Sequence, residues 1–210
     1  MNVYDFDDTI YDGDTNKDII KYALKKYPKI TIKALMRARK VNKEYKRNLV
    51  LFERVKEEML SFIFQIPNYP KFINDFVKDH MHKIKPWYLR NKSEHDIILS
   101  ASYYLWISVF ARVLGVKNVI ATKTDSNGKI IGSNCKNTEK VRRLQELVPD
   151  LNNINIAYGD SSNDIPVLDI AKSAFVVEGN KLIPYHKGYK FKSNRECILW
   201  GIYERKKFWN

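Results

Sequence analysis

Cysteine is scarce in this chain: only Cys135 and Cys197 occur among the 210 residues, and they form no CxxC pair. That scarcity excludes a disulfide framework and argues against a zinc site built on thiolates. Long hydrophobic runs are also missing, because no apolar stretch approaches the roughly 18 residues that a membrane-spanning helix needs. The first residues lack the basic and apolar regions of a secretory signal. We therefore expect a soluble globular protein of the reducing cytoplasm.

Acidic residues are the minority among the charged ones. The chain has 37 Lys and Arg against 24 Asp and Glu, which gives a net charge of +13 at pH 7. A surplus of this kind attracts phosphorylated metabolites, nucleic acid or an anionic membrane surface. No nucleic-acid-reading motif accompanies it, and lysines spread along helices usually form solvated faces. The charge alone therefore selects no partner, and we do not expect nucleic acid to be one.

Short apolar runs rich in β-forming residues recur along the chain, at residues 2–6, 95–99, 118–121, 154–158 and 174–177. Continuous runs of this length are typical of buried parallel strands. Stretches with helical spacing follow at 102–114, 138–148 and 163–171, and a capping box at Ser193 and Glu196 predicts a last helix. This alternation predicts an α/β fold built on a doubly wound, Rossmann-like parallel sheet.

The roughly eighty residues between the first and second runs have a different character, because no convincing strand occurs in them. Helical spacing fills them instead, in a segment that begins near Thr15 and in the ranges 32–48, 49–65 and 69–83. An insertion this long is not an ordinary crossover. We predict a catalytic core of residues 1–13 and 86–210 and a smaller helical cap domain of residues 14–85. An Asn-Gly turn within 123–131 predicts a small hairpin.

The few acids gather at the start of the chain, where MNVYDFDDTIYDGD carries five aspartates. Asp5, Ser100 and Asp160 each follow a predicted strand, and the carboxyl ends of parallel strands meet at one edge of a sheet. Several carboxylates in one small space repel one another unless a divalent cation lies between them. Oxygen ligands without His or Cys favour Mg²⁺, which often binds phosphate as well. The residues therefore predict a Mg²⁺-assisted phosphoryl site.

The segment DFDDT resembles motif one, DxDxT, of the haloacid dehalogenase superfamily of phosphohydrolases. Three further segments resemble the remaining motifs in the same order: Ser100 in ILSAS motif two, Lys140 in CKNTEKVRRL motif three, and Asp160 and Asp164 in YGDSSNDIPVL motif four. One match alone would be weak, but the four together cover almost the whole predicted core. The cap position, the SAS triplet and GDSSND resemble the phosphoserine-phosphatase-like branch.

The resemblance implies a role for each matched residue. Asp5 would be the nucleophile that forms an aspartyl-phosphate, and Asp7 would protonate the leaving oxygen and then activate water. Asp7 would also bind the metal through its backbone carbonyl, while Asp164 would act through water or by orienting Lys140. The implied metal-binding residues are Asp5, Asp7, Asp160 and Asp164. The implied substrate-binding residues are Ser100, Ala101, Lys140, Asn163 and Asp14.

Several positions depart from the phosphoserine phosphatase pattern. Asp14 stands where those enzymes usually carry Glu, and tyrosines follow Ser102 where they usually have glycines. Asp8 has no evident role. Lys136 is an alternative to Lys140 as the lysine of motif three, although EKVRRL around Lys140 is the better match to the family's helix start.

We therefore predict a Mg²⁺-dependent phosphatase that hydrolyses a small phosphomonoester through an aspartyl-phosphate. A phosphotransferase that uses an acceptor alcohol is an alternative. A phosphatidylglycerophosphatase-like lipid phosphatase is another, because the basic surface and the ending ERKKFWN could suit a membrane-facing substrate. We nevertheless expect a solvated terminus at Arg205–Trp209 and no contact with a membrane surface. Outside the enzymes, a basic nucleic-acid-binding protein or a phospho-accepting signalling protein would carry some of these residues, but not all the motifs in this order. The pattern specifies neither the substrate nor the oligomeric state.

Overall fold

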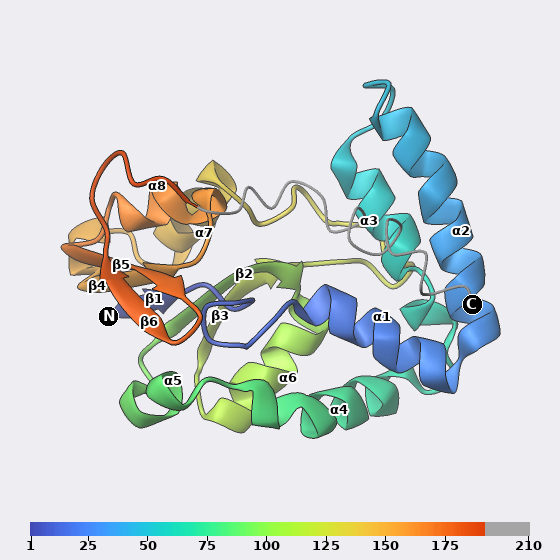
Figure 1. Cartoon of the computed structure of the whole chain (residues 1–210), viewed down its shortest axis with the longest axis horizontal. Helices are drawn as coiled ribbons and strands as arrows, with labels where there is room; N and C mark the ends of the chain where they lie inside the picture. The colour runs from blue at the N-terminus through green and yellow to red at the C-terminus, as the bar shows by residue number, and fades with distance from the viewer. Residues whose placement is uncertain (192–210) are drawn as a thin grey trace.

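A computed structural model describes residues 1–191 and contains one six-stranded sheet (Figure 1). The strands lie in the order β3-β2-β1-β4-β5-β6, and all neighbours are parallel except β5 and β6. The predicted doubly wound parallel sheet is confirmed, with β6 as an antiparallel addition that the sequence pattern did not indicate. The strands are β1 (Asn2–Tyr4), β2 (Ile97–Tyr103), β3 (Asn118–Thr122), β4 (Ile156–Gly159), β5 (Ser173–Glu178) and β6 (Lys181–Pro184).

Helices cover both faces of the sheet because successive strand residues point to opposite sides. Val3 packs with the face covered by α7 (Thr138–Leu147) and α8 (Ile165–Leu168), and Tyr4 packs with the opposite face. That opposite face carries α5 (Pro86–Asn91) and α6 (Tyr104–Leu114) (Figure 1). Two 3₁₀ turns, η3 (Leu151–Asn153) and η4 (Ser162–Asp164), flank β4.

The segment between β1 and β2 is helical, as its spacing predicts. Asp14 caps α1 by accepting hydrogen bonds from the backbone N–H groups of Asn16 and Lys17, and Pro28 occupies the first position of α2, where its missing N–H costs nothing. Its elements are α1 (Thr15–Lys26), α2 (Pro28–Tyr45), α3 (Phe52–Leu60), η1 (Ile63–Gln65), α4 (Tyr69–His80) and η2 (Met81–Lys83).

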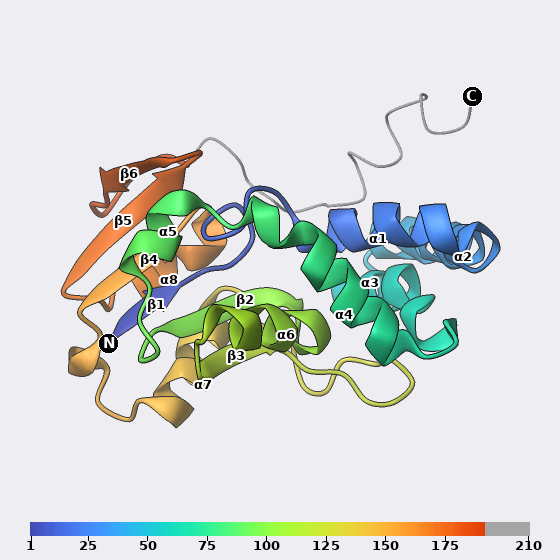
Figure 2. The same ribbon diagram turned by 90° about the horizontal axis from the view of Figure 1, so that it is seen from below.

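Hydrophobic packing does not stop at the boundary between this insertion and the sheet. A single buried cluster contains Phe6 from the end of β1, Phe110 from α6, and Met59 and Phe76 from the insertion. The rings of Phe76 and Phe110 lie 6.1 Å apart, where α4 runs alongside α6 (Figure 2). The helices of residues 14–85 therefore share part of their core with α6, and the division into cap and catalytic core stays a prediction.

Several predicted bounds are wrong. Strand β2 continues through Ser100 to Tyr103, with an irregular register after Ser100, so Ser100 lies within a strand and not after it. The helix expected over 163–171 is only the short α8, and the helix expected over 49–65 begins at Phe52 and ends at Leu60. The small hairpin expected within 123–131 does form, as a single antiparallel bridge between Thr124 and Ile130. The capping box at Ser193 and the ending ERKKFWN lie outside the described residues.

Candidate active site

The loop after β1 folds back sharply, which places Asp5 and Asp7 at the edge of the sheet. The backbone N–H groups of Ile10 and Tyr11 both donate to the carbonyl oxygen of Phe6. Asp8 adopts a left-handed backbone conformation with φ of 55°, a region in which Asp and Asn are several-fold enriched. Its carbonyl oxygen accepts a hydrogen bond from Nζ of Lys85. This backbone conformation explains the acid at position 8, for which the sequence indicated no role.

Lys140 lies between two of the predicted catalytic aspartates. Its Nζ is 2.6 Å from Oδ1 of Asp5 and 2.6 Å from Oδ1 of Asp164, and its side chain is 2% exposed. Burial by itself lowers the pKa of a lysine, but here the charges of Asp164 and Asp5 outweigh it and raise the pKa of Lys140 above its usual value. Lys140 is therefore a permanent positive charge in the first turns of α7.

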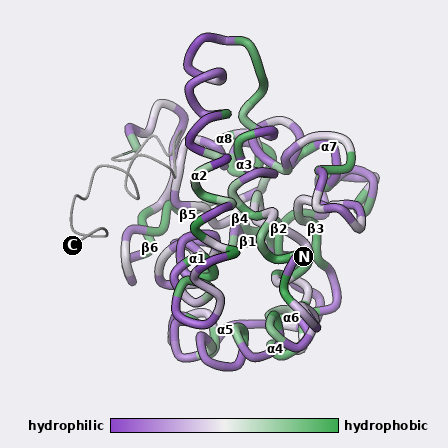
Figure 3. Tube along the Cα trace, turned by 90° about the vertical axis from the view of Figure 1, so that its right-hand side faces the viewer, coloured by the Kyte–Doolittle hydropathy of each residue, from purple (hydrophilic) through white to green (hydrophobic). Residues whose placement is uncertain are grey.

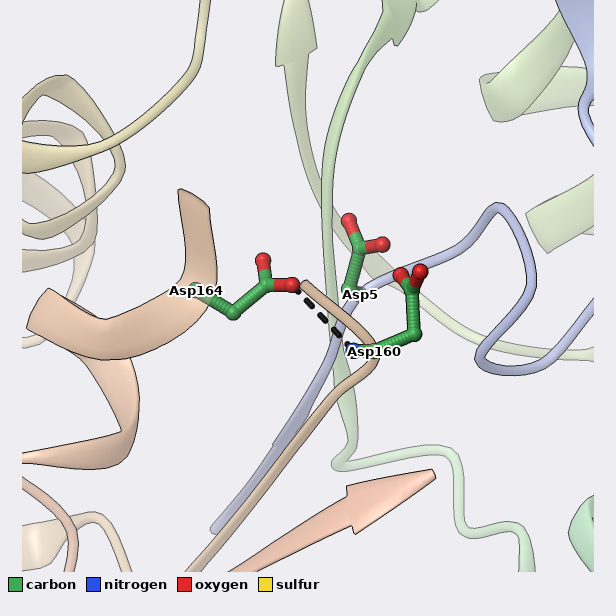
Figure 4. Close-up of side chains that lie close together, drawn as sticks. All are labelled: Asp5, Asp160 and Asp164. Carbon is green, nitrogen blue, oxygen red and sulfur yellow. Dashed lines mark hydrogen bonds between the residues drawn. The ribbon is translucent and has the colours of Figure 1, made fainter. Parts of the chain in front are cut away.

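Three carboxylates converge at this point (Figure 4). Asp5 and Asp160 follow the neighbouring strands β1 and β4, Asp164 approaches from the turn that precedes α8, and one oxygen from each lies within 4.8 Å of the others. The second oxygen of Asp164 accepts hydrogen bonds from the backbone N–H groups of Asp160 (3.2 Å) and Ser161 (3.1 Å). Thr9 donates to Asp160 across 3.4 Å. Asp164 is thus held by backbone N–H groups, and Asp160 by the hydroxyl of Thr9.

A glycine makes this convergence sterically feasible. A Cβ atom on Gly159 would lie 2.4 Å from the Cβ of Asp164, closer than real Cβ contacts come. Gly159 is the last residue of β4, and Asp164 packs directly over it. The glycine of GDSSND therefore provides room for the aspartate five residues later.

The cluster carries more negative charge than Lys140 offsets. Burial raises the pKa of Asp5, against the opposing charge of Lys140, and burial together with the charges of Asp5 and Asp164 raises the pKa of Asp160. Crowded carboxylates of this kind bind a divalent cation because it relieves their repulsion. All the donors are carboxylate oxygens, the ligands that suit Mg²⁺. The residues present therefore fit a hard divalent metal ion.

Asp7 is held by hydrogen bonds to both of its carboxylate oxygens. One oxygen accepts from the backbone N–H of Thr15 at 2.6 Å, and the other accepts from the hydroxyl of Ser102 at 2.5 Å. Asn16 donates to the same hydroxyl oxygen at 2.6 Å. Burial, and after it the charge of Asp14, raises the pKa of Asp7 to about 7. Asp7 can therefore exchange a proton near neutral pH.

A second buried lysine reaches the site from the insertion. Lys56 of α3 is 2% exposed, and its Nζ donates to the carbonyl oxygen of Ala101 (2.6 Å) and to Oδ1 of Asn134 (2.8 Å). Burial lowers the pKa of Lys56 to about 8, although the charges of Asp7 and Asp14 oppose this shift. The ammonium group of Lys56 therefore donates its hydrogen bonds to uncharged oxygens and not to a carboxylate.

These groups surround a cavity of about 140 Å³. Most of the predicted site residues line it: Asp5, Asp7, Asp14, Ala101, Lys140, Asp160, Asn163 and Asp164. Ser100 does not, since it is fully buried and its hydroxyl oxygen accepts a hydrogen bond from the backbone N–H of Ser102. Lys136 also lines the cavity, 5.4 Å from the ring centroid of Phe52, but Lys140 is the lysine that pairs with the aspartates.

Two residues of the site escaped the sequence argument. Lys56 could not be ranked above Arg47 or Arg54, because a helical pattern does not show which of several cations faces inward. Ser102 carried a weak signal as the last residue of the SAS triplet, but its contact with Asp7 joins positions 95 residues apart. Only the folded chain shows that pairing.

A doubly wound α/β sheet with carboxylates at the carboxyl ends of β1 and β4 and a buried lysine between them defines a site for phosphoryl chemistry. The model of the haloacid dehalogenase-like hydrolase family matches residues 3–169, most of the chain. The protein therefore belongs to that family, and the family and hydrolase class predicted from the four motifs are confirmed.

The individual proteins that the chain resembles share only part of its length or little of its sequence. The chain is 39% identical to protein CicA of Caulobacter vibrioides over 89 residues, which cover 39% of this chain and only 40% of CicA. A Bordetella pertussis protein of unknown function has a similar fold, with a TM-score of 0.66 and 18% identity over 84% of this chain and 88% of that one. A phosphoserine phosphohydrolase-like protein of Francisella tularensis, also 18% identical, gives 0.51 over 84% and 87%. These likenesses show a shared fold.

Proposed function

We propose that this protein is a Mg²⁺-dependent phosphatase that hydrolyses a small phosphomonoester through an aspartyl-phosphate on Asp5. The observation that carries the proposal is Lys140 held at 2.6 Å from both Asp5 and Asp164, beside Asp160 in a cavity at the edge of the sheet. A nucleophile, a fixed cation and a carboxylate cluster for a divalent metal are the groups that phosphoryl transfer requires. The Francisella relative, named phosphoserine phosphohydrolase-like, is consistent with this chemistry.

In the first half-reaction, a carboxylate oxygen of Asp5 attacks phosphorus, the bond from phosphorus to the leaving oxygen breaks, and Asp7 donates its proton to that oxygen. In the second half-reaction, the Asp7 carboxylate takes a proton from water, the water oxygen attacks phosphorus, and phosphate leaves Asp5. Lys140 offsets negative charge on the phosphoryl oxygens throughout. Asp5, Asp160 and the backbone carbonyl of Asp7 would hold Mg²⁺, which supplies further positive charge there.

The remaining predicted contacts follow from the cavity lining. Ala101, Asn163 and Asp14 line the cavity, so we assign them to the substrate side. Ser100 stays a prediction as a phosphate ligand, because its hydroxyl is engaged with the backbone of Ser102. We also propose that the enzyme works in a reducing cytoplasm, in agreement with the buried free thiol of Cys135.

The test is release of inorganic phosphate from p-nitrophenyl phosphate with Mg²⁺ and after chelation. We expect Asp5→Asn to reduce turnover by roughly a thousandfold or more, because the amide is not a nucleophile. Asp12→Asn is the matched control, since Asp12 belongs to the same segment but is exposed. Undiminished turnover in purified Asp5→Asn protein would refute the proposal.

The natural substrate requires a screen of phosphorylated amino acids, alcohols, sugars, nucleotides and lipids. Adding acceptor alcohols to the same assay separates a hydrolase from a phosphotransferase, since only a phosphotransferase forms a new phosphate ester. We expect free phosphate as the main product, because Asp7, whose pKa is raised to about 7 by burial, would accept a proton from water.

A further inference from the structure

The most exposed large hydrophobic side chains of the described residues lie together in the insertion. Leu51 is 75% exposed, Leu49 is 68% exposed and Met36 is 65% exposed, more than any other large hydrophobic residue in this part of the chain. All three belong to residues 28–51, which comprise α2 and the turn that joins it to α3. We call this segment the α2 arm. It projects away from the sheet (Figure 1).

Positive charge surrounds these side chains. The α2 arm contains eight Lys and Arg and one acid, Glu44, so that 24 residues carry a net charge of +7 out of +13 for the whole chain. Seven of the eight cations are exposed, and the eighth, Arg37, pairs with Glu58 at 3.1 Å. Figure 3 shows the contrast, with a largely hydrophilic α2 and turn apex followed by a hydrophobic stretch that leads to α3.

Most of the exposed residues of α2 form one stripe. Positions three or four apart in a helix lie on the same face, and the residues at that spacing here are Lys29, Lys33, Met36, Lys40 and Lys43. The opposite face is buried against the rest of the insertion through Thr31, Ala34, Leu35 and Ala38. The stripe therefore faces away from the protein, and the turn with Leu49 and Leu51 continues from its end.

We propose that the α2 arm docks on an anionic lipid bilayer. Cations along one helix face bind lipid phosphates, and apolar side chains next to them enter the interface between headgroups and acyl chains. Nucleic acid fits this surface less well, because its phosphates would satisfy the lysines but would leave Leu49 and Leu51 in water. In the described part of the chain, no helix combines the length and apolar character needed to cross a bilayer. The contact is therefore peripheral.

Docking would bring the candidate active site close to the membrane surface. Helix α3 begins at Phe52, the residue after Leu51, and both Phe52 and Lys56 line the cavity. The inference goes beyond the proposed function and does not depend on it, because binding to vesicles is measured without turnover.

The test uses the full chain and sedimentation with phosphatidylcholine vesicles, with and without phosphatidylglycerol, at low and high salt. We expect binding only to the vesicles that contain phosphatidylglycerol, and loss of that binding at high salt. Leu49→Ser with Leu51→Ser, and separately Lys40→Glu with Lys43→Glu, should each weaken binding roughly tenfold or more. All four residues are exposed, so thermal unfolding should be unchanged.

Matched controls carry the same substitutions elsewhere. Leu147→Ser with Leu182→Ser removes two exposed leucines outside the arm, and Lys181→Glu with Lys187→Glu reverses two exposed charges there. Both control proteins should bind like the wild type. In Leu51→Trp, the fluorescence should shift to the blue on anionic vesicles and be quenched by brominated lipid.

Three results would overturn the proposal. One is wild-type protein that stays in solution with anionic vesicles. Another is binding that the arm variants and their controls weaken equally. The third is a preference for nucleic acid. In that case a mixed-sequence nucleic acid would bind in a salt-sensitive way, and Lys40→Glu with Lys43→Glu would abolish this binding. Leu49→Ser with Leu51→Ser would leave both nucleic-acid binding and vesicle binding intact.

Discussion

Two buried lysines line the same cavity, Lys140 from α7 and Lys56 from α3, and their surroundings shift their pKa values in opposite directions. Lys140 comes from the sheet side, where Asp5 and Asp164 raise its pKa. Lys56 comes from the insertion, where burial lowers its pKa to about 8. Both are 2% exposed. Burial is therefore not what distinguishes them; the difference is that Lys140 has ionised partners and Lys56 has a carbonyl and an amide.

The opposite pKa shifts of Lys140 and Lys56 indicate different roles for the two lysines. A lysine whose pKa is raised by neighbouring carboxylates stays positively charged at neutral pH and is suited to hold a phosphoryl group during transfer. A lysine whose charge is poorly compensated by its neighbours gains when an anion enters, so Lys56 is suited to meet the substrate. The following predictions test that division, from the largest expected effect to the smallest.

Lys140→Met should produce the largest change. It removes the cation between Asp5 and Asp164, and we expect turnover of p-nitrophenyl phosphate to fall roughly a thousandfold. Without metal, the free energy of unfolding in urea should also fall by about 3 kcal/mol, because two buried carboxylates lose their partner. Lys136→Met provides the control from the same segment. Equal losses in the two variants would contradict the special position of Lys140.

Lys56→Met should change the pH dependence of stability. Between about pH 8 and pH 10.5, Lys56 is mostly neutral in the folded protein while an unfolded lysine still binds its proton, so wild-type stability should rise with pH in this window relative to Lys56→Met. The expected rise is about 3 kcal/mol. Urea unfolding in chelator at several pH values measures it, with the exposed Lys33→Met as control. Parallel curves for the wild type and Lys56→Met would show that Lys56 is not destabilised by burial.

Ser102→Ala should have a smaller and more selective effect. If the hydroxyl orients Asp7 as the acid, its loss slows esters with poor leaving groups, which need the proton, and spares those that leave readily. We expect roughly tenfold slower turnover of alkyl phosphates and little change with p-nitrophenyl phosphate. Ser102→Thr keeps the hydroxyl and should restore most of the difference. A uniform loss across both substrate types would indicate a merely structural role for the serine.

Much of the fold could be predicted because buried parallel strands appear in the sequence as short apolar runs. β1, β3 and β4 appear where those runs lie, shifted by a residue or two. β6 was missed because Lys181–Pro184 is a short, largely exposed edge strand without an apolar run. The end of β2 was placed too early, since the polar Ser100 resembles a strand end although it pairs with Ala121.

The candidate site divides in the same way. Asp5 and Asp160 could be brought together from sequence, because the topology of a parallel sheet determines which loops meet, whereas Lys140 and Asp164 were assigned through the resemblance of their segments to the family's motifs. The partners of Lys56 could not, since they depend on how α3 packs over residues that are 45 and 78 positions away. Asp8 shows a third case, in which the left-handed backbone conformation that favours Asp appears only in the folded loop.

The shared hydrophobic cluster of α4 and α6 bears on how this protein could have been assembled and how it could be re-engineered. An insertion that packs only on itself is an independent domain and can be exchanged between relatives. Here, removal of residues 14–85 would take away packing partners of Phe110 and Trp106 and expose a hydrophobic surface on α6. Grafting another family member's insertion onto this sheet therefore requires α6 to be redesigned with it, because the two elements bury each other's side chains.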